Sequence, residues 1–381
     1  MFIVNFEELG IMKYKYKNLV VAYGSNLCGE DWNRFASRNG IDGECLNFEE
    51  VVTIPDYKLV FNTASRSRNG GVLNIQKAKG YVVPAGLFSV NQAGLELLRR
   101  KEGVPFKYLE ENVSVIQYDG SEISALTYIV PPERCELYVE PHPDYLQVCL
   151  DGYNAYGMDT EDLLRASNNQ LAKPLTALFA YGTLMRNESR FATALKHGIN
   201  CALVGQIFGR LTTNGSYPAL NLCEDGYAWG DYLVSDNITS LLTDTDHIEG
   251  FLGFGQEGSL FRRTCVEVDV GGVGQRFSWV YVMNSKLDLD IISNDWRAHR
   301  SKRTQFVSNL VESHAMGVTD FGKQVCDRYY RFGTVERPDE FSMEKIKELI
   351  ADGDKLSERH LAQISGLWAA LSSDFEQRID Y

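Results

Sequence analysis

Short apolar runs alternate with amphipathic segments along the first 300 residues of the chain. The run at residues 18–23 ends in Gly-Ser-Asn, and the run at residues 175–181 ends in Gly-Thr-Leu. An apolar run that stops at glycine predicts a buried strand that enters a tight turn. Helical spacing of apolar positions then follows at residues 30–37 and 188–197. The two halves of the chain therefore begin alike.

A second pattern also occurs once in each half, and in the same order. Residues 80–90 begin with Gly-Tyr, continue as an apolar strand, and precede a leucine-rich helix that ends in Glu102-Gly. Residues 226–234 begin with Gly-Tyr, continue as a strand, and precede a helix that ends in Glu249-Gly. A single matching motif would be weak evidence, but two motifs that recur in the same order in both halves indicate that a domain was duplicated.

A third block is a strand with a single tyrosine. It comprises residues 125–130 with Tyr128 and residues 278–283 with Tyr281. Both have the β-branched and aromatic bias of a buried strand. The long period of the repeat excludes a solenoid and predicts two copies of one domain.

The repeat places the domains at residues 18–168 and 175–300, with a polar junction between them. The pattern changes after about residue 300. Residues 344–349 and 356–371 have apolar positions at helical spacing, so we expect residues 301–381 to form a helical extension.

Composition excludes several classes of protein. The net charge of −13 argues against nonspecific binding to nucleic acid, which needs clustered Lys and Arg. Eight cysteines without a CxxC pair and six scattered histidines argue against a disulfide framework or a zinc site. No apolar run approaches the ~20 residues that span a bilayer, and Glu7 and Glu8 lie where a signal peptide would be apolar. We therefore expect a cytoplasmic protein without a membrane or nucleic-acid partner.

The first turn is a candidate binding site. A strand that ends in Gly24-Ser25-Asn26 and enters a helix leaves backbone N–H groups that converge, and glycine permits the φ values such a turn needs. Converging N–H groups bind a carboxylate, a phosphate or a developing oxyanion. An ordinary strand-to-helix turn uses the same residue types, so the motif alone leaves both interpretations open. Neither turn has the lysine of a P-loop or the third glycine of a dinucleotide fingerprint.

Glu102 and Glu249 are the candidate catalytic residues. A single glutamate is usually a solvated surface side chain, but these two occupy the same place in both copies. A glutamate drawn toward an apolar pocket has a raised pKa. It can then take up and give back a proton near neutral pH.

Together these pieces resemble the γ-glutamylcyclotransferase family. The first copy, over residues 18–165, resembles the enzymes that act on glutathione and γ-glutamyl amino acids. The second, over residues 175–300, resembles the γ-glutamylamine cyclotransferases. In the first copy the matching features are Tyr23-Gly24-Ser25-Asn26-Leu27, residues 70–75, Glu102-Gly-Val, Tyr128 and Pro143-Asp-Tyr145. In the second copy they are Tyr181-Gly182-Thr183-Leu184-Met185, residues 217–220, Glu249-Gly, Arg262, residues 279–281 and residues 295–297.

The resemblance implies an α+β fold of two tandem γ-glutamylcyclotransferase-like mixed β-barrels with flanking helices. It also implies a reaction in which the α-amine of a γ-glutamyl substrate attacks its own γ-carbonyl and releases 5-oxoproline. Glu102 and Glu249 would carry the proton between the two nitrogens, so the enzyme would be an amide-cleaving lyase or an acyltransferase. No metal or organic cofactor is needed, and the implied partner is a small γ-glutamyl compound.

The resemblance further implies which residues bind that substrate. Backbone N–H groups of the two turns would hold its carboxylate or oxyanion, and tyrosines would line each pocket. The expected substrate-binding residues are Tyr23, Gly24, Ser25, Asn26, Leu27, Tyr128 and Tyr145 in the first copy, and Tyr181, Gly182, Thr183, Leu184 and Tyr281 in the second.

Some features leave alternatives open. Leu184 stands where the first copy has Asn26, which removes an amide from the second site. We expect residues 253–258 to be a loose surface loop rather than a lid, and Phe106 and Tyr108 to serve packing. Two other functions compete with the cyclotransferase: γ-glutamyl acyl transfer or deprotection in a biosynthetic pathway, and non-catalytic binding of a γ-glutamyl or carboxylate ligand.

Overall fold

The computed structural model describes residues 13–300 of the protein, except 215–216, 288 and 292. The expected helical extension at residues 301–381 lies outside the described residues. The chain divides into two compact units. One runs to Thr176 and includes Ile238–Ser259 and Arg263–Val266, and the other includes Ala177–Asn237, Leu260–Arg262 and the chain from Glu267. The domain limits drawn from the sequence stay predictions.

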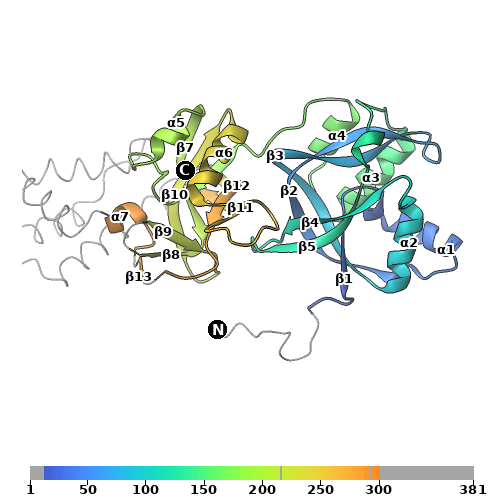
Figure 1. Ribbon diagram of the computed structural model, residues 1–381, viewed down its shortest axis with the longest axis horizontal. Coiled ribbons are helices and arrows are strands. Elements are labelled where there is room, and N and C mark those ends of the chain that lie inside the picture. The colour runs from blue at the N-terminus through green and yellow to red at the C-terminus, as the bar shows by residue number, and fades with distance from the viewer. Residues whose placement is uncertain (1–12, 215–216, 288, 292, 301–381) are drawn as a thin grey trace, which may run out of the picture. The chain divides into compact units, whose positions relative to one another are not determined.

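The first unit is built on a closed five-stranded barrel of order β1-β3-β2-β4-β5 (Figure 1). Val20 of β1 pairs in parallel with Leu126 of β5, and this pairing closes the barrel. The strands are β1 (Asn18–Ala22), β2 (Leu46–Ser65), β3 (Gly70–Val90), β4 (Leu109–Ile116) and β5 (Glu122–Ile129). The helices are η1 (Ser25–Leu27), α1 (Gly29–Arg38), η2 (Gly43–Cys45), α2 (Gln92–Glu102), η3 (Pro132–Arg134), α3 (Pro143–Ala155) and α4 (Glu161–Ser167).

A long hairpin of β2 and β3 forms much of this barrel. Its register shifts at three places, between Phe48 and Glu50, Pro55 and Tyr57, and Phe61 and Thr63. Such bulges bend and twist paired strands, so two long strands can curve around a core. The sequence predicted a strand that begins near Gly80, but β3 already begins at Gly70 and is one strand of 21 residues.

The second barrel has the same order of strands. Counted from its first strand the order is β6-β10-β7-β11-β12, and Trp279 of β12 pairs in parallel with Leu178 of β6. The strands are β6 (Ala177–Ala180), β7 (Ile199–Phe208), β10 (Tyr227–Ser235), β11 (Arg262–Val270) and β12 (Gly274–Val282). A three-stranded sheet joins β13 (Leu289–Asp290), β8 (Arg210–Thr213) and β9 (Pro218–Asn221). The helices are α5 (Phe191–Leu195), α6 (Ile238–Glu249) and α7 (Trp296–Arg300).

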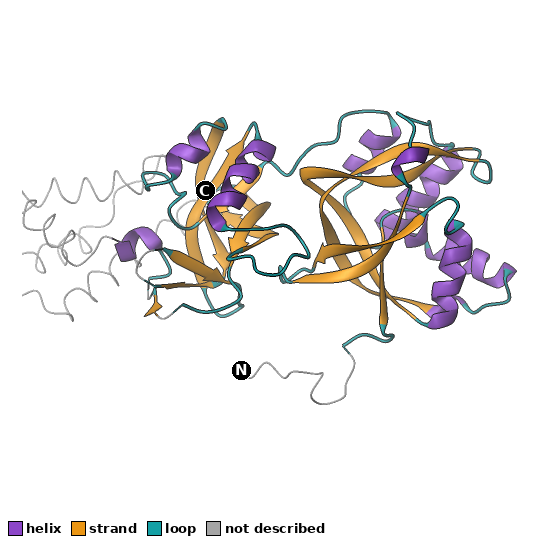
Figure 2. Ribbon diagram, in the orientation of Figure 1, coloured by secondary structure: helices purple, strands orange, loops and turns teal. Residues whose placement is uncertain are grey.

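The matching strand orders confirm the predicted fold class of two tandem mixed barrels with helices, which Figure 2 distinguishes by colour. One helix is shorter than expected. The sequence predicted residues 188–197, but α5 begins at Phe191. The Arg190 N–H donates instead to the Thr183 carbonyl at 2.9 Å, so the chain before Phe191 remains in turns. No helix in the described ranges has both the length and the apolar character needed to cross a membrane.

Helix α3 packs closely on the turn that follows β1. A Cβ atom at Gly152 would lie 2.6 Å from the Leu27 Cβ atom and 2.9 Å from the Cys28 nitrogen. On the same helix, the Tyr153 hydroxyl donates to the Tyr23 carbonyl at 3.1 Å. The absence of a side chain at position 152 therefore lets α3 support this turn.

We expect Gly152→Ala to lower the free energy of unfolding by about 1–3 kcal/mol, because the new methyl group overlaps backbone and Cβ atoms that cannot rotate away. Urea denaturation followed by tryptophan fluorescence measures the change. Gly29→Ala is the matched control, since no atom lies within 4 Å of its added Cβ. Equal stability of the two variants would contradict the close packing.

Candidate active site

A buried tyrosine fixes the end of the first strand. The Tyr23 hydroxyl donates to the Tyr128 carbonyl on β5 at 2.5 Å, and the Tyr23 carbonyl accepts from Tyr153. Burial raises the pKa of Tyr23, so its hydroxyl remains a donor at neutral pH. The turn after β1 is therefore held by its own tyrosine, by the barrel and by α3.

The turn leaves backbone donors available. The Leu27 N–H donates to the Gly24 carbonyl at 2.9 Å, and the Cys28 N–H donates to the Ser25 carbonyl at 3.2 Å. Within residues 13–300 the Ser25 and Asn26 N–H groups have no hydrogen-bond acceptor among the described protein atoms. Adjacent N–H groups at a helix start can bind an anion.

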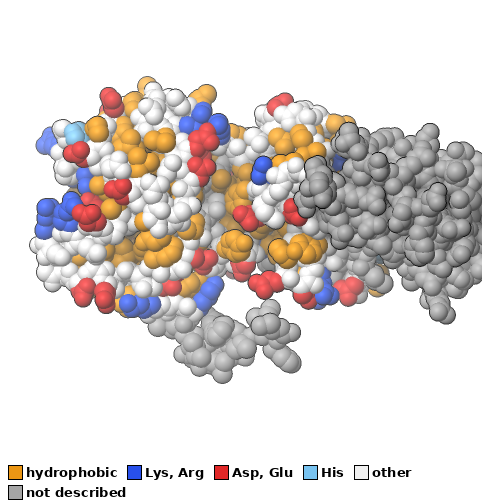
Figure 3. Space-filling model, turned by 180° about the vertical axis from the view of Figure 1, so that it is seen from behind, with side chains coloured by type: hydrophobic (Ala, Val, Ile, Leu, Met, Phe, Trp, Pro, Cys, Tyr) orange, Lys and Arg blue, Asp and Glu red, His pale blue; other side chains and the backbone are white. Residues whose placement is uncertain are grey.

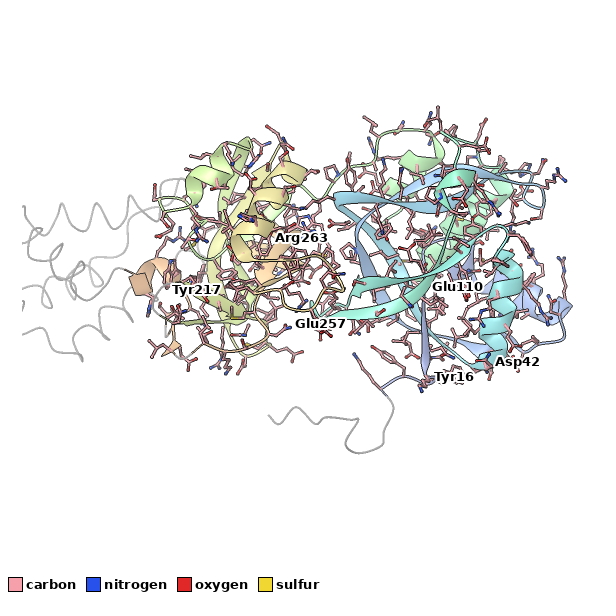
Figure 4. All side chains as sticks on the ribbon, viewed as in Figure 1. Tyr16, Asp42, Glu110, Tyr217, Glu257 and Arg263 are labelled. Atoms are coloured by element: carbon pink, nitrogen blue, oxygen red, sulfur yellow. The ribbon has the colours of Figure 1, made fainter. Side chains whose placement is uncertain are left out.

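Helix α2 brings Glu102 to a defined position. Its N-terminus is capped by the Asn91 side chain, which accepts from the Gly94 N–H at 2.9 Å. It ends at Gly103, whose φ of 66° stops the helix directly after Glu102. Arg99 in the last turn pairs with Glu110 of β4 at 2.8 Å, which ties this end of α2 to the barrel. Figure 4 labels Glu110.

The Asn26 amide joins the turn to Glu102. Asn26 Nδ2 donates to Glu102 Oε1 at 2.7 Å, although the residues are 76 positions apart in the sequence. Burial raises the pKa of the Glu102 carboxyl, while Lys101, the Asn26 hydrogen bond and Arg68 act in the opposite direction. The two motifs singled out from the sequence thus meet at one place.

Three tyrosines lie near the turn or near this carboxyl group. The Leu73 N–H donates to the Tyr145 hydroxyl at 3.3 Å, and the Tyr108 hydroxyl donates to the Leu73 carbonyl at 3.1 Å. A Cβ atom placed on Gly24 would lie 3.8 Å from the Tyr145 hydroxyl, so Tyr145 lies beside the turn. The Tyr128 hydroxyl instead donates to Glu110 at 3.4 Å.

Phe106 and Tyr108, which follow α2, were both expected to serve packing, and this is wrong for Phe106. Phe106 is 75% exposed, because the chain turns back after Gly103 and directs it outward. Tyr108 lies near the candidate site: burial and the charge of Glu102 raise the pKa of its hydroxyl. Sequence reasoning therefore missed Tyr108 as a neighbour of Glu102.

A charged cluster beside the turn was also missed. Asp31 of α1 accepts from both terminal nitrogens of Arg68, at 2.7 and 3.1 Å, and lies 2.9 Å from Lys101 Nζ. Burial alone would raise the pKa of Asp31, but Arg68 and Lys101 outweigh it and lower the pKa to about 2. The sequence signals were that Lys101 directly precedes Glu102 and that Arg68 lies two positions before Gly70, where the family-like segment at residues 70–75 begins.

The second barrel repeats the tyrosine anchor. The Tyr181 hydroxyl donates to the Tyr281 carbonyl at 2.7 Å, and the Met185 N–H donates to the Gly182 carbonyl at 3.0 Å. Leu184 in this turn is buried. The predicted turn and the predicted tyrosine strand therefore come together in this copy as well.

Glu249 has the same place in its helix as Glu102. It is the last residue of α6, it is partly buried, and Gly250 follows it with a φ of 62°. Thr183 lies in the turn after Tyr181, where its carbonyl accepts from Arg190. The roles proposed for these residues stay predictions.

A buried carboxylate marks the second barrel. Asp231 is fully buried, accepts from the Arg186 N–H and side chain at 2.8 Å each, and accepts from Arg297 at 3.2 Å. Although burial opposes ionisation, the two guanidinium groups lower the pKa of Asp231. This cluster fixes the chain just after the Tyr-Gly turn.

The arrangement in the first barrel suits proton transfer at an anionic substrate. A carboxyl with a raised pKa lies next to a turn with available N–H donors. Among the described residues, no group of three or more His, Cys, Asp or Glu side chains gathers as a metal site would require. Charged side chains of both signs are spread among apolar ones on the face shown in Figure 3.

Comparison with known proteins gives the following matches. The family model described as Gamma-glutamyl cyclotransferase, AIG2-like, matches residues 178–298. A solved structure described as a gamma-glutamyl cyclotransferase is 25% identical and covers 41% of this chain and 88% of its own, with a TM-score of 0.34. An uncharacterized protein from Homo sapiens is 27% identical over 41% and 88% of the two chains, with a TM-score of 0.33. YkqA from Bacillus subtilis is 15% identical over 71% and 84%, with a TM-score of 0.28. No curated protein matches the chain.

We expect the Asp31 cluster to contribute stability that depends on pH. Because the folded-state pKa of Asp31 lies below its unfolded value, this stability is present above about pH 4 and is lost as pH falls toward about 2. Asp31→Asn should lower the free energy of unfolding by about 2 kcal/mol at pH 7 and by much less at pH 2.5.

Urea denaturation at the two pH values measures this difference. Glu30→Gln on the same helix is the control, since its surface pair with Arg34 is mostly exposed and should contribute little at either pH. A loss in Asp31→Asn that is the same at both pH values would contradict the role assigned to the ionised carboxylate.

Proposed function

We propose that this protein cleaves a γ-glutamyl amide and releases 5-oxoproline with an amine or amino acid, a reaction suggested by the match of residues 178–298 to the family model described as Gamma-glutamyl cyclotransferase, AIG2-like. The observation that carries the proposal is the contact of Asn26 with Glu102, which joins the Tyr-Gly turn of the first barrel to a half-buried carboxyl group. A cytoplasmic location and a small γ-glutamyl partner are part of the same proposal.

The proposed reaction needs only the substrate's own nucleophile. The substrate α-amine attacks the γ-carbonyl carbon, and the new C–N bond closes a five-membered ring. Glu102 accepts a proton from the attacking nitrogen and returns it to the leaving nitrogen as the original amide C–N bond breaks. Holding the two groups in place is an intramolecular advantage of up to about 7–11 kcal/mol, so a covalent enzyme intermediate is unnecessary.

The residues around Glu102 support these steps. A carboxyl with a raised pKa exchanges a proton more readily near neutral pH than an ordinary glutamate does. The available Ser25 and Asn26 N–H groups lie at the same turn and would bind the substrate carboxylate or the developing oxyanion. Tyr108 and Tyr145 would enclose the glutamyl part of the substrate.

The first barrel is the better candidate for the working site. Its glutamate has an amide partner in the turn, whereas the corresponding position of the second barrel is the buried Leu184. The second barrel keeps the tyrosine anchor and a glutamate at the end of α6. It would therefore serve a different substrate or a supporting role.

We expect Glu102→Gln to lower 5-oxoproline release by about 10²–10⁴-fold, because the proton carrier is lost while the shape of the side chain is kept. The assay uses the full chain with glutathione, γ-glutamyl amino acids and γ-glutamyl amines. Glu249→Gln tests the second barrel in the same panel. Glu133→Gln, an exposed glutamate in η3, is the control and should keep full activity.

The outcomes separate the candidate functions. Loss of release with one substitution identifies the working barrel, and the preferred leaving group identifies the substrate class. Ligand binding by folded wild type without any 5-oxoproline release would reject the cyclotransferase in favour of a binding protein. Release of an acyl group to an added acceptor, with no 5-oxoproline, would support transfer or deprotection instead.

A further inference from the structure

We propose that Lys101 is a positioning residue: its ammonium group fixes which way the Asn26 amide faces and so directs the amide N–H₂ of Asn26 at Glu102. This inference rests on the proposed function for its catalytic meaning. The geometry on which it is based does not depend on that function.

Lys101 is buried and contacts Asn26 instead of extending into solvent. Its side chain is only 7% exposed, and its Nζ atom donates to Asn26 Oδ1 at 2.8 Å. The same Nζ atom lies 2.9 Å from Asp31 Oδ2 and 5.9 Å from the centre of the Trp32 ring. Lys101 and Glu102 are neighbours in sequence, yet both contact the same amide from α2.

Because an amide has one acceptor end and one donor end, Lys101 determines the orientation of the Asn26 side chain. An asparagine side chain has an acceptor oxygen and a donor nitrogen of nearly equal size, and an ammonium group can only donate. The Lys101 contact therefore requires the oxygen on its side, which leaves Nδ2 for Glu102. With the amide reversed, its oxygen would face Glu102, and only a protonated carboxyl could then form a hydrogen bond with it.

Asp31 holds the lysine in this position. Arg68 donates one hydrogen bond to each oxygen of the Asp31 carboxylate. The Arg68 guanidinium also lies 5.3 Å from the centre of the Tyr145 ring. Two-point contacts of this type fix both distance and angle. A continuous series of contacts thus runs from Arg68 through Asp31, Lys101 and Asn26 to Glu102.

The second copy lacks both members of the central pair. Leu184 replaces Asn26, and Ile248 precedes Glu249 where Lys101 precedes Glu102. An inward-facing lysine without an acceptor would carry the desolvation cost of an unpaired charge. Loss of the two residues together is the pattern expected if the lysine serves the asparagine.

The charges around Glu102 set the direction of the expected effect. Lys101 and Arg68 favour the ionised carboxyl, Asp31 disfavours it, and the hydroxyl groups of Tyr23, Tyr108 and Tyr128 lie nearby. Removing Lys101 deletes a positive charge and frees the amide to reverse. Both changes favour the protonated form, so the Glu102 pKa must rise.

The first test is the pH profile of kcat/KM for 5-oxoproline release. Lys101→Met should move the acidic limb to higher pH by about one unit or more, while Lys101→Arg, which keeps the charge and the donor, should restore most of the wild-type profile. Lys77→Met is the control, since the Lys77 side chain is 78% exposed and pairs with Glu111. An unchanged acidic limb in Lys101→Met would overturn the proposal.

The second test needs no activity. Carbon-13 NMR of the labelled glutamate carboxyls of the full chain, with the Glu102 signal assigned from Glu102→Gln, reports its titration directly. Lys101→Met should raise this pKa in wild type and raise it less in Asn26→Leu, where the amide is absent and only the direct charge effect of Lys101 remains. Equal shifts in the two backgrounds would show a direct charge effect and reject positioning through Asn26.

These readouts separate the two proposals. If the chain releases no 5-oxoproline but Lys101→Met still shifts the Glu102 titration through Asn26, the positioning role holds and the proposed function fails. If release depends on Glu102 but not on Lys101, the proposed function holds and the positioning role of Lys101 fails. Should Lys101→Met not fold, as judged by circular dichroism, Lys101→Leu, which also removes the charge and the donor, replaces it in both tests and must raise the Glu102 pKa more in wild type than in Asn26→Leu.

Discussion

The hydrogen bond from a buried tyrosine to the carbonyl of another tyrosine, across the parallel strands that close each barrel, is the constraint on which the rest of the structure depends. It joins Tyr23 to Tyr128 in one barrel and Tyr181 to Tyr281 in the other. Because this bond fixes the end of the first strand, it also fixes the turn that follows. The backbone donors of that turn are placed by the same closure, and in the first barrel the Asn26 amide of the turn contacts Glu102 at the end of α2.

The sequence predicted the fold because strand, turn and helix signals recur in the same order in both halves. The family resemblance also implied that Asn26 and Glu102 belong to one site, and the two side chains are in contact. It could not predict the cluster of Asp31, Arg68 and Lys101, since these residues are far apart in the chain and their pairing depends on how α1, α2 and a hairpin loop meet. The outward turn of Phe106 likewise depends on the local backbone after Gly103 and not on residue type.

The two barrels share the tyrosine hydrogen bond but differ in the buried charged residues beside the turn. In the first, polar contacts lead from Asp31 to the carboxyl of Glu102. In the second, Asp231 is enclosed by Arg186 and Arg297, and the turn presents a leucine in place of the amide. The barrel backbone thus tolerates a change of chemistry at the turn, because the tyrosine anchor, and not the turn's side chains, carries the architecture.

The glycine that ends α2 directly after Glu102 also determines the electrostatic setting of that carboxyl. The C-terminus of a helix carries a partial negative charge, so it is the end at which an ionised glutamate is least favoured. The positive charges of Lys101, in the last turn of α2, and of Arg68 favour the ionised state instead. Glu102 therefore lies between a helix dipole that favours its protonated form and two cations that favour its ionised form, a balance suited to a group that must both accept and release a proton within one turnover.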